Sequence, residues 1–252
     1  MKWLKSLKKV KVSSLEKGIQ VINLLENKAL KFDNISYYLN EQCNVPIVLI
    51  DLEHYKAQLI QLSWSNLLSV AEVHALEKVA VRVQSIAIER LTGRLAAKLA
   101  LAALTRALLK ECQILTSSSG QPYSACGRFI SISHSGQYVV ATASNSVIGI
   151  DIQKNKKFSN AALDMAFKTQ EMLNHTLGSH TLIWTIKESF LKALGLGIFP
   201  HINNIELKKE FQKYFIETSS TYIHNVITLL GGNTQITTGS LSQYCYSITQ
   251  IE

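Results

Sequence analysis

The stretch Val147-Ile148-Gly149-Ile150-Asp151-Ile152-Gln153 decides the fold class of the second half of the chain. Its β-branched apolar residues predict a buried strand. Because side chains alternate along a strand, Gly149 and Asp151 share one face and the isoleucines share the other. The Asp151 carboxylate then lies beside a position without a side chain, where a bulky anion or a hydrated metal ion would have room. A strand-end Asp that caps a turn is the alternative interpretation.

The stretch Trp184-Thr185-Ile186-Lys187-Glu188-Ser189-Phe190-Leu191-Lys192-Ala193-Leu194-Gly195 predicts a helix. Glu188 and Lys192 form an i,i+4 pair, which on most helices is an ion pair that faces solvent. Trp184 and Leu191 flank this pair, so the carboxylate borders apolar surface, which favours a cleft. The side of the helix that packs into the core is predicted to consist of Ile183, Ile186, Phe190, Ala193 and Leu194.

A third stretch, Ser131-Ile132-Ser133-His134-Ser135-Gly136, is expected to form a turn after a short strand at 129–132. Backbone N–H groups, hydroxyls and a protonated imidazole can bind a phosphate there. A hydrogen-bonded turn histidine is the alternative. The sequence contains no nucleophile-elbow pattern and neither of the usual glycine-rich nucleotide-binding patterns, so those hydrolase and nucleotide-binding classes are not indicated.

The remaining pattern predicts an α+β fold of two similar halves. We expect a basic N-terminal extension at 1–35, a first α+β half at 36–146 and a second half at 147–252 that carries the metal site. Matching positions of Gly93–Lys98 and Lys187–Lys192 indicate a diverged duplication. Helices are predicted at 69–83, 85–110, 160–174 and 182–194, strands at 46–52, 205–208, 211–217, 222–230 and 244–251, and a hairpin of 138–143 with 147–152.

Composition narrows the class of protein. Of the 252 residues, 47% are hydrophobic, enough for a sizeable core, and no apolar run is long enough to span a bilayer. The first 17 residues carry six lysines and one acid without a signal-peptide core, so we expect a cytoplasmic protein. This N-terminal segment is interpreted as a solvated extension or as a basic surface helix. Four separated cysteines argue against a zinc site, and the net charge of +8 favours an anionic partner.

Together, in order and spacing, these stretches resemble the Sfp-like family of 4'-phosphopantetheinyl transferases. The resemblance rests on Ile-Ser-His-Ser-Gly at 132–136, Ile-Gly-Ile-Asp-Ile at 148–152 and the Trp-x-x-Lys-Glu-Ser-x-x-Lys pattern at 184–192. Gly120-Gln121-Pro122 is similar to the family's Gly-x-Pro loop, and Gly93-Arg94 to its first-half helix. The resemblance covers residues 45 to 230.

The resemblance implies two α+β halves related by pseudo-two-fold symmetry, with coenzyme A in the cleft between them. It implies that Asp151 and Glu188 bind Mg²⁺, that Glu188 takes the proton of a carrier-protein serine, and that Lys192 stabilises the departing phosphate oxygen. The products would be holo-carrier protein and 3',5'-ADP, and the partner a fatty-acid, polyketide or peptidyl carrier protein. The implied coenzyme A contacts are Gln121, Pro122, Ser133, His134, Lys187 and Arg94.

Three features of the sequence depart from the family pattern. Gln153 replaces a frequent acid and would offer Mg²⁺ a neutral oxygen at most. Gln121 replaces a frequent basic residue, and the expected basic cluster before Gly93 is reduced to Lys78, Arg82 and Arg90. A non-catalytic module that binds coenzyme A or a carrier protein is the alternative function. Basic residues are not interleaved with stacking aromatics, so we expect no nucleic-acid partner, and we expect a monomer.

Overall fold

The computed structural model describes residues 7–10, 35–40, 45–53, 68–69, 72, 84–118 and 120–252. The chain forms two compact units, Met1–Asn145 and Ser146–Glu252. The division falls one residue before the boundary expected from the sequence. Within the described residues, no helix combines the length and the apolar character needed to cross a membrane.

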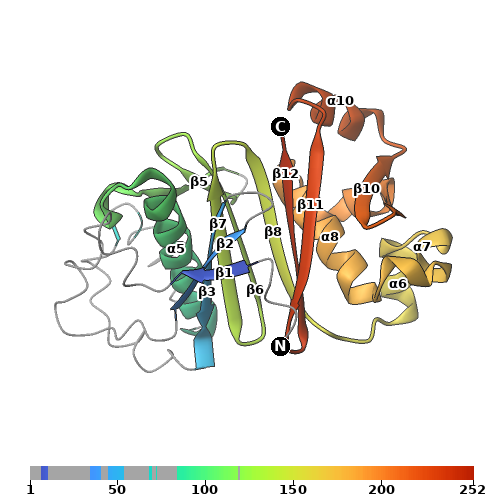
Figure 1. The fold of residues 1–252 in the computed structure, drawn as a ribbon, viewed down its shortest axis with the longest axis horizontal. Helices are drawn as coiled ribbons and strands as arrows, with labels where there is room; N and C mark the ends of the chain where they lie inside the picture. Colours follow the sequence, from blue (N-terminus) through green and yellow to red (C-terminus); the bar gives the residue numbers. More distant parts are fainter. Residues whose placement is uncertain are drawn as a thin grey trace. The chain divides into compact units, whose positions relative to one another are not determined.

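The first unit is a five-stranded antiparallel sheet packed against one long helix (Figure 1). Helix α5 lies against β3, β6 and β7, and a small β4–β5 hairpin follows it in the chain. The strands are β1 (Leu7–Val10), β2 (Ile35–Asn40), β3 (Pro46–Asp51), β4 (Ile114–Thr116), β5 (Pro122–Ser124), β6 (Phe129–Ser135) and β7 (Tyr138–Ser144), and the helices are α5 (Gln84–Thr105) and the short η4 (Leu109–Glu111). The sheet order is β1-β2-β3-β7-β6.

Helix α5 approaches the sheet closely because Gly93 has no side chain. A Cβ at Gly93 would lie 2.9 Å from a methyl carbon of Ile132 on β6. Alanines and leucines of α5, among them Ala96, pack on β3 and β7 to form the core of this unit. The helix ends at Thr105, since Arg106 has a left-handed φ of 59°. The predicted end at 110 is therefore wrong.

The second unit is a three-stranded antiparallel sheet, order β11-β12-β8, with helix α8 packed along β8 and β12. A two-stranded hairpin of β9 and β10 forms a separate sheet. The strands are β8 (Val147–Lys154), β9 (Ile205–Glu210), β10 (Lys213–Thr218), β11 (Thr234–Leu241) and β12 (Tyr244–Ile251). The helices are α6 (Asn160–Ala166), α7 (Thr169–Leu173), η5 (His175–Leu177), α8 (His180–Ala193), α9 (Ile198–His201), η6 (Ile202–Asn204) and α10 (Thr221–Leu229).

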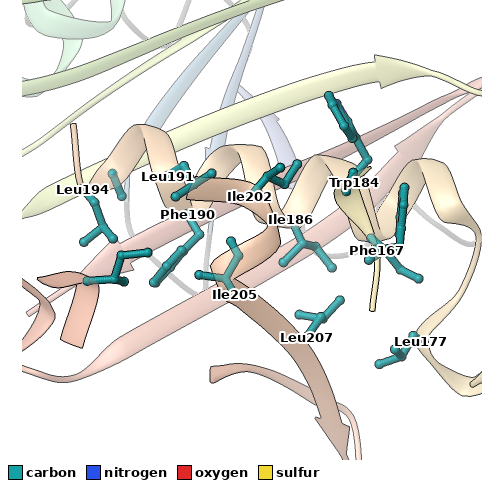
Figure 2. Packing of buried hydrophobic residues seen from close by; sticks show 14 of the residues in the cluster. Phe167, Leu177, Trp184, Ile186, Phe190, Leu191, Leu194, Ile202, Ile205 and Leu207 are labelled. Carbon is teal, nitrogen blue, oxygen red and sulfur yellow. The ribbon is translucent and has the colours of Figure 1, made fainter. Parts of the chain in front are cut away.

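Helix α8 is buried along almost its whole length because it has packing partners on two sides. One side meets the sheet. Figure 2 shows Ile186 and Phe190 pointing from α8 toward Ile205 and Leu207 of β9, while Trp184 is directed another way. All five residues predicted for the core side of this helix are buried in this cluster. A helix with partners on two sides is held against both rotation and sliding.

The two units repeat one order of elements, which confirms the α+β class. In each unit one strand is followed further along the chain by a long helix, a two-stranded hairpin and then two paired strands, so β3, α5, β4–β5 and β6–β7 correspond to β8, α8, β9–β10 and β11–β12. The pairing order is also shared, β6-β7-β3 in the first unit and β11-β12-β8 in the second. Such agreement supports the predicted duplication of one supersecondary unit.

Several predicted elements differ from the structure. Residues 138–143 and 147–152 are strands but belong to different sheets, and β7 instead forms a hairpin with β6. The β-branched residues of 222–230 suggested a strand, yet this segment is the helix α10, because Ser220 caps it by accepting a hydrogen bond from Ile223 N. Strand β11 was not predicted. The 160–174 helix is interrupted at Phe167, whose backbone is extended.

Four residues of the N-terminal segment are described. Leu7–Val10 is the strand β1, paired in antiparallel register with β2, so the surface-helix interpretation is wrong at these residues. Most of the rest of the predicted extension lies outside the described residues. The predicted 69–83 helix, apart from Ser69 and Glu72, also lies outside them, as do Lys78 and Arg82.

Candidate active site

Gly149 brings helix α8 into direct contact with strand β8. A Cβ on Gly149 would lie 1.9 Å from the carbonyl oxygen of Ser189 and 2.6 Å from the backbone nitrogen of Ala193. The space beside Asp151 is therefore filled by α8. This corrects the expectation that an anion or a hydrated ion occupies it, because the missing side chain accommodates a helix backbone instead.

Small polar residues form the centre of the contact between helix α8 and the sheet. The Ser189 hydroxyl oxygen lies 3.0 Å from Ser247 Oγ and 2.8 Å from Thr249 Oγ1. The Ser189 hydroxyl also donates to the Ile186 carbonyl oxygen at a distance of 2.9 Å. These hydroxyls are buried, with exposed fractions of 0%. Short side chains and satisfied hydroxyls let the helix approach the strand, and this approach fixes which α8 residues reach Asp151.

Asp151, Glu188 and Lys192 meet where α8 lies against β8. The Lys192 ammonium nitrogen Nζ is 2.6 Å from Asp151 Oδ1 and 3.8 Å from Glu188 Oε2. The Asp151 side chain is 1% exposed, the Glu188 side chain 11% and the Lys192 side chain 28%. The structure thus brings together the three residues predicted to carry the chemistry, and Lys192 is the one that reaches solvent most.

Burial and the neighbouring Asp151 carboxylate raise the pKa of Glu188 to about 8. A hydrogen bond with Asp151 contributes in the same direction, while Lys192 and the Trp184 indole lower the pKa of Glu188. Glu188 therefore holds its proton close to neutral pH. A buried carboxyl group with a pKa near working pH is suited to accept and release a proton.

The carboxylate pair has the chemistry expected of a divalent-cation site. The neighbouring Asp151 carboxylate contributes to the raised pKa of Glu188, and a bound cation would reduce the repulsion between the two carboxylates. Mg²⁺ prefers such oxygen ligands. Gln153, half-buried and two residues beyond Asp151 on β8, offers a neutral oxygen from the same face of the strand. Across the residues that the structure describes, no cluster of three or more acidic, His or Cys side chains could hold a metal. Asp151, Glu188 and Gln153 fit an ion that completes its shell with water or substrate oxygens.

Lys187 does not have the predicted position. Its side chain is fully buried, and Nζ donates to Glu171 Oε2 at 2.6 Å and to the Ala166 carbonyl at 2.9 Å. Burial lowers the pKa of Lys187, and Glu171 opposes that effect. The predicted contact of Lys187 with a coenzyme A phosphate is therefore replaced by a structural ion pair inside the second unit.

Among the first-half candidates, Arg94, Gln121 and Pro122 lie around the β4–β5 hairpin. Arg94 Nη1 donates to the Ile114 carbonyl at 2.5 Å, and Nη2 donates to the Thr116 hydroxyl. Thr116 pairs with Pro122 in the hairpin, and Gln121 is exposed just before it. Arg94 thus ties α5 to the hairpin that presents Gln121 and Pro122, although burial lowers the pKa of the guanidinium.

Ser133 and His134 lie in β6 and point to opposite sides of it. Strand β6 continues to Ser135, and the turn comes at Gly136, whose φ is 54°. The predicted turn at 131–136 is therefore wrong for all but its last residue. Ser133 is buried, whereas the His134 side chain is 58% exposed, with Nδ1 3.6 Å from Glu89 Oε2 on α5. Of the two, the structure leaves His134 accessible to a ligand.

Several residues of the site were not identified from the sequence. Glu171, Ser247 and Thr249 come from segments without a recognised pattern, and Lys156 lies with Nζ 5.7 Å from the Trp184 ring centre. The close packing at Ser189 could have been inferred from the Lys-Glu-Ser segment, because a small polar residue in a helix turn that faces the core indicates close packing. Their partners are distant in sequence, so spacing could not reveal them.

A buried Asp–Glu pair and a lysine thus lie together where strand β8 meets helix α8 in the second unit. Residues 147–238 match the family model described as "4'-phosphopantetheinyl transferase superfamily". This part of the chain, which contains Asp151, Glu188 and Lys192, is therefore similar to that superfamily.

A curated relative supports the same assignment. The chain is 32% identical over 97 residues to "4'-phosphopantetheinyl transferase gsp" of Aneurinibacillus migulanus, an alignment that covers 36% of this chain and 41% of the relative. The chain therefore spans about two fifths of the length of the curated relative it matches.

Proposed function

We propose that the protein transfers the 4'-phosphopantetheine group of coenzyme A to a serine of an acyl or peptidyl carrier protein. The observation that carries the proposal is the Glu188 carboxyl group, whose pKa is raised to about 8 beside Asp151 and within 3.8 Å of the Lys192 ammonium. A carboxyl group and an ammonium group thus lie at one buried site, in the part of the chain that matches the superfamily model.

The proposed reaction forms one bond and breaks one bond at phosphorus. The carrier serine oxygen bonds to the phosphorus of the phosphopantetheine group, and the pyrophosphate bond to the 3',5'-ADP portion breaks. Glu188 accepts the serine proton, directly or through water. The Lys192 ammonium stabilises the charge that develops on the departing phosphate oxygen.

Asp151 acts mainly through charge in this proposal. It holds Lys192 at 2.6 Å, and in the absence of a bound cation it raises the pKa of Glu188. Asp151, Glu188 and the Gln153 amide oxygen would hold Mg²⁺, which supplies charge neutralisation at the pyrophosphate. The exposed His134 and Gln121 and the half-buried Pro122 of the first unit are proposed to contact coenzyme A, with Arg94 supporting the hairpin that carries the last two.

The test is intact-mass spectrometry of an apo-carrier protein incubated with the protein, coenzyme A and Mg²⁺. We expect the carrier to gain the mass of one phosphopantetheine group on its serine, and 3',5'-ADP to appear in equal amount. A panel of fatty-acid, polyketide and peptidyl apo-carriers identifies the substrate class. Coenzyme A binding without any mass gain across the panel would favour the alternative, a non-catalytic binding module.

Two further expectations belong to the same proposal. A single active site of this kind needs no second copy, so we propose a monomer, which light scattering during gel filtration measures. Free coenzyme A and apo-carrier proteins are cytoplasmic substrates, so we propose a cytoplasmic location, which fractionation of the native cells tests.

A further inference from the structure

A buried lysine–glutamate pair occurs once in each unit, in the same structural setting. In the second unit Lys187 on α8 binds Glu171 on α7 at 2.6 Å, and in the first unit Lys98 on α5 binds Glu72 at 2.9 Å. All four side chains are 0% exposed. We call these the second-unit pair and the first-unit pair.

The carboxylates of the two pairs also accept hydrogen bonds from backbone N–H groups at corresponding positions. Glu171 Oε2 accepts from the N–H of Lys168, three residues earlier, and Oε1 accepts from Leu207 N on β9. Glu72 Oε2 accepts from the N–H of Ser69, again three residues earlier, and Oε1 accepts from Ile114 N on β4. In both units one carboxylate therefore joins the long helix to the first strand of the following hairpin.

This correspondence changes the internal alignment of the two halves. Lys98 corresponds structurally to Lys187, whereas the sequence comparison had matched it with Lys192. With this alignment, Leu99 follows the first-unit lysine and Glu188 follows the second-unit lysine. Of the two pairs, only the second-unit pair adjoins the Asp151–Glu188–Lys192 site.

We propose that the second-unit pair is a positioning element for Glu188, while the first-unit pair serves stability alone. Lys187 and Glu188 are consecutive on α8, and the Lys187 bonds to Glu171 and Ala166 hold the side of the helix that faces away from the sheet. Gly149 and Ser189 hold the other side. The rotation of α8 about its axis is therefore set by contacts on both sides.

A small rotation of this helix is enough to matter. With side chains, a helix is about 10–12 Å wide, so a rotation of about 10° moves a side-chain end by about 1 Å. A displacement of about 1 Å at a reacting group can lower a rate by about 100-fold. Loosening the second-unit pair would thus reduce turnover through Glu188, although neither Lys187 nor Glu171 touches the reacting atoms.

The test compares two matched double variants, Lys187→Met/Glu171→Gln and Lys98→Met/Glu72→Gln. Each removes one buried ion pair while keeping side-chain length, so that no buried charge is left alone. Assays are run at a temperature where melts show both variants folded. We expect kcat of phosphopantetheine transfer to fall at least about 10-fold in the second-unit variant, with KM for coenzyme A within about twofold of wild type. The first-unit variant should keep kcat within about threefold.

The kinetic part of this test rests on the proposed function. Hydrogen exchange is therefore measured as well, since it does not require activity. We expect faster exchange of the α8 amides in the second-unit variant, and of the α5 amides in the first-unit variant. Absence of transfer by the wild-type protein would refute the proposed function and leave the exchange result intact. Equal loss of kcat in both variants, or wild-type kcat with loosened α8, would overturn the positioning role.

Discussion

A side-chain carbon at Gly149 would lie 1.9 Å from the Ser189 carbonyl oxygen, so strand β8 and helix α8 are too close at this point for any side chain to fit between them. We therefore expect Gly149→Ala to push α8 off the strand and to lower the free energy of unfolding by at least about 3 kcal/mol. Denaturant unfolding measures this. Gly197→Ala is the matched control, since its nearest neighbour would be 3.5 Å from the new carbon, and it should cost about 0.5 kcal/mol or less. Similar losses in both variants would contradict the close-contact interpretation.

Replacement of the proposed base, Glu188→Gln, should abolish transfer and leave the fold intact. Glutamine keeps the shape of the protonated carboxyl group but cannot accept the serine proton. A rate loss of at least about 100-fold is expected from removal of a general base. A transfer assay and a thermal melt on the same sample separate chemistry from folding. The control is Glu217→Gln, whose side chain is 67% exposed and which should be neutral. Near-normal turnover of Glu188→Gln would remove Glu188 from the catalytic role.

The raised pKa of Glu188 predicts how stability depends on pH. In the folded protein this pKa is about 8, raised by burial and Asp151 from the ordinary 4.5. The folded state thus holds a proton that the unfolded chain releases, so the contribution is fully present below about pH 4.5 and is lost as the pH rises through about 8. Each unit of pKa shift corresponds to about 1.4 kcal/mol. We expect the melting temperature of the wild type to fall between about pH 5 and pH 8, and Glu188→Gln to show a smaller fall. Parallel curves would refute the shift.

Gln153 allows a test of the proposed ion ligands. If Asp151 and Glu188 supply the charged ligands, Gln153→Ala should cost little activity at saturating Mg²⁺, and Gln153→Glu should lower the Mg²⁺ concentration needed for half-maximal rate. Asp151→Ala should inactivate, because it removes a ligand and the partner of Lys192 at 2.6 Å. Magnesium titrations of the three variants measure this. If Gln153→Ala is as inactive as Asp151→Ala, Gln153 is itself a required ligand.

His134 is the exposed first-unit candidate for a coenzyme A phosphate. Loss of a charge-assisted hydrogen bond would weaken coenzyme A binding by roughly 1 to 3 kcal/mol in His134→Ala. Isothermal calorimetry measures the affinity. His175→Ala, at an exposed position of the second unit, is the control and should bind coenzyme A normally. Unchanged affinity in His134→Ala would contradict its assignment.

The sequence predicted well wherever a local pattern decided the structure. The strand around Asp151, the helix around Glu188 and the core side of that helix follow from apolar periodicity, which reflects burial of one face. Elements whose pairing or caps depend on distant or terminal residues were missed, as for α10, β11 and the β6–β7 hairpin.

The sequence by itself determined the class of residues at the site, since Asp151, Glu188 and Lys192 lie in patterns that resemble the superfamily matched at 147–238. Only the tertiary structure decided which groups surround them. It showed that Gly149 makes room for a helix backbone, that Lys187 is buried against Glu171, and that Lys98 repeats this pair with Glu72. The physical reason is that spacing along a helix or strand defines which residues share a face, whereas the partner of each face comes from segments distant in the chain, and that partner sets burial, pKa and access to a ligand.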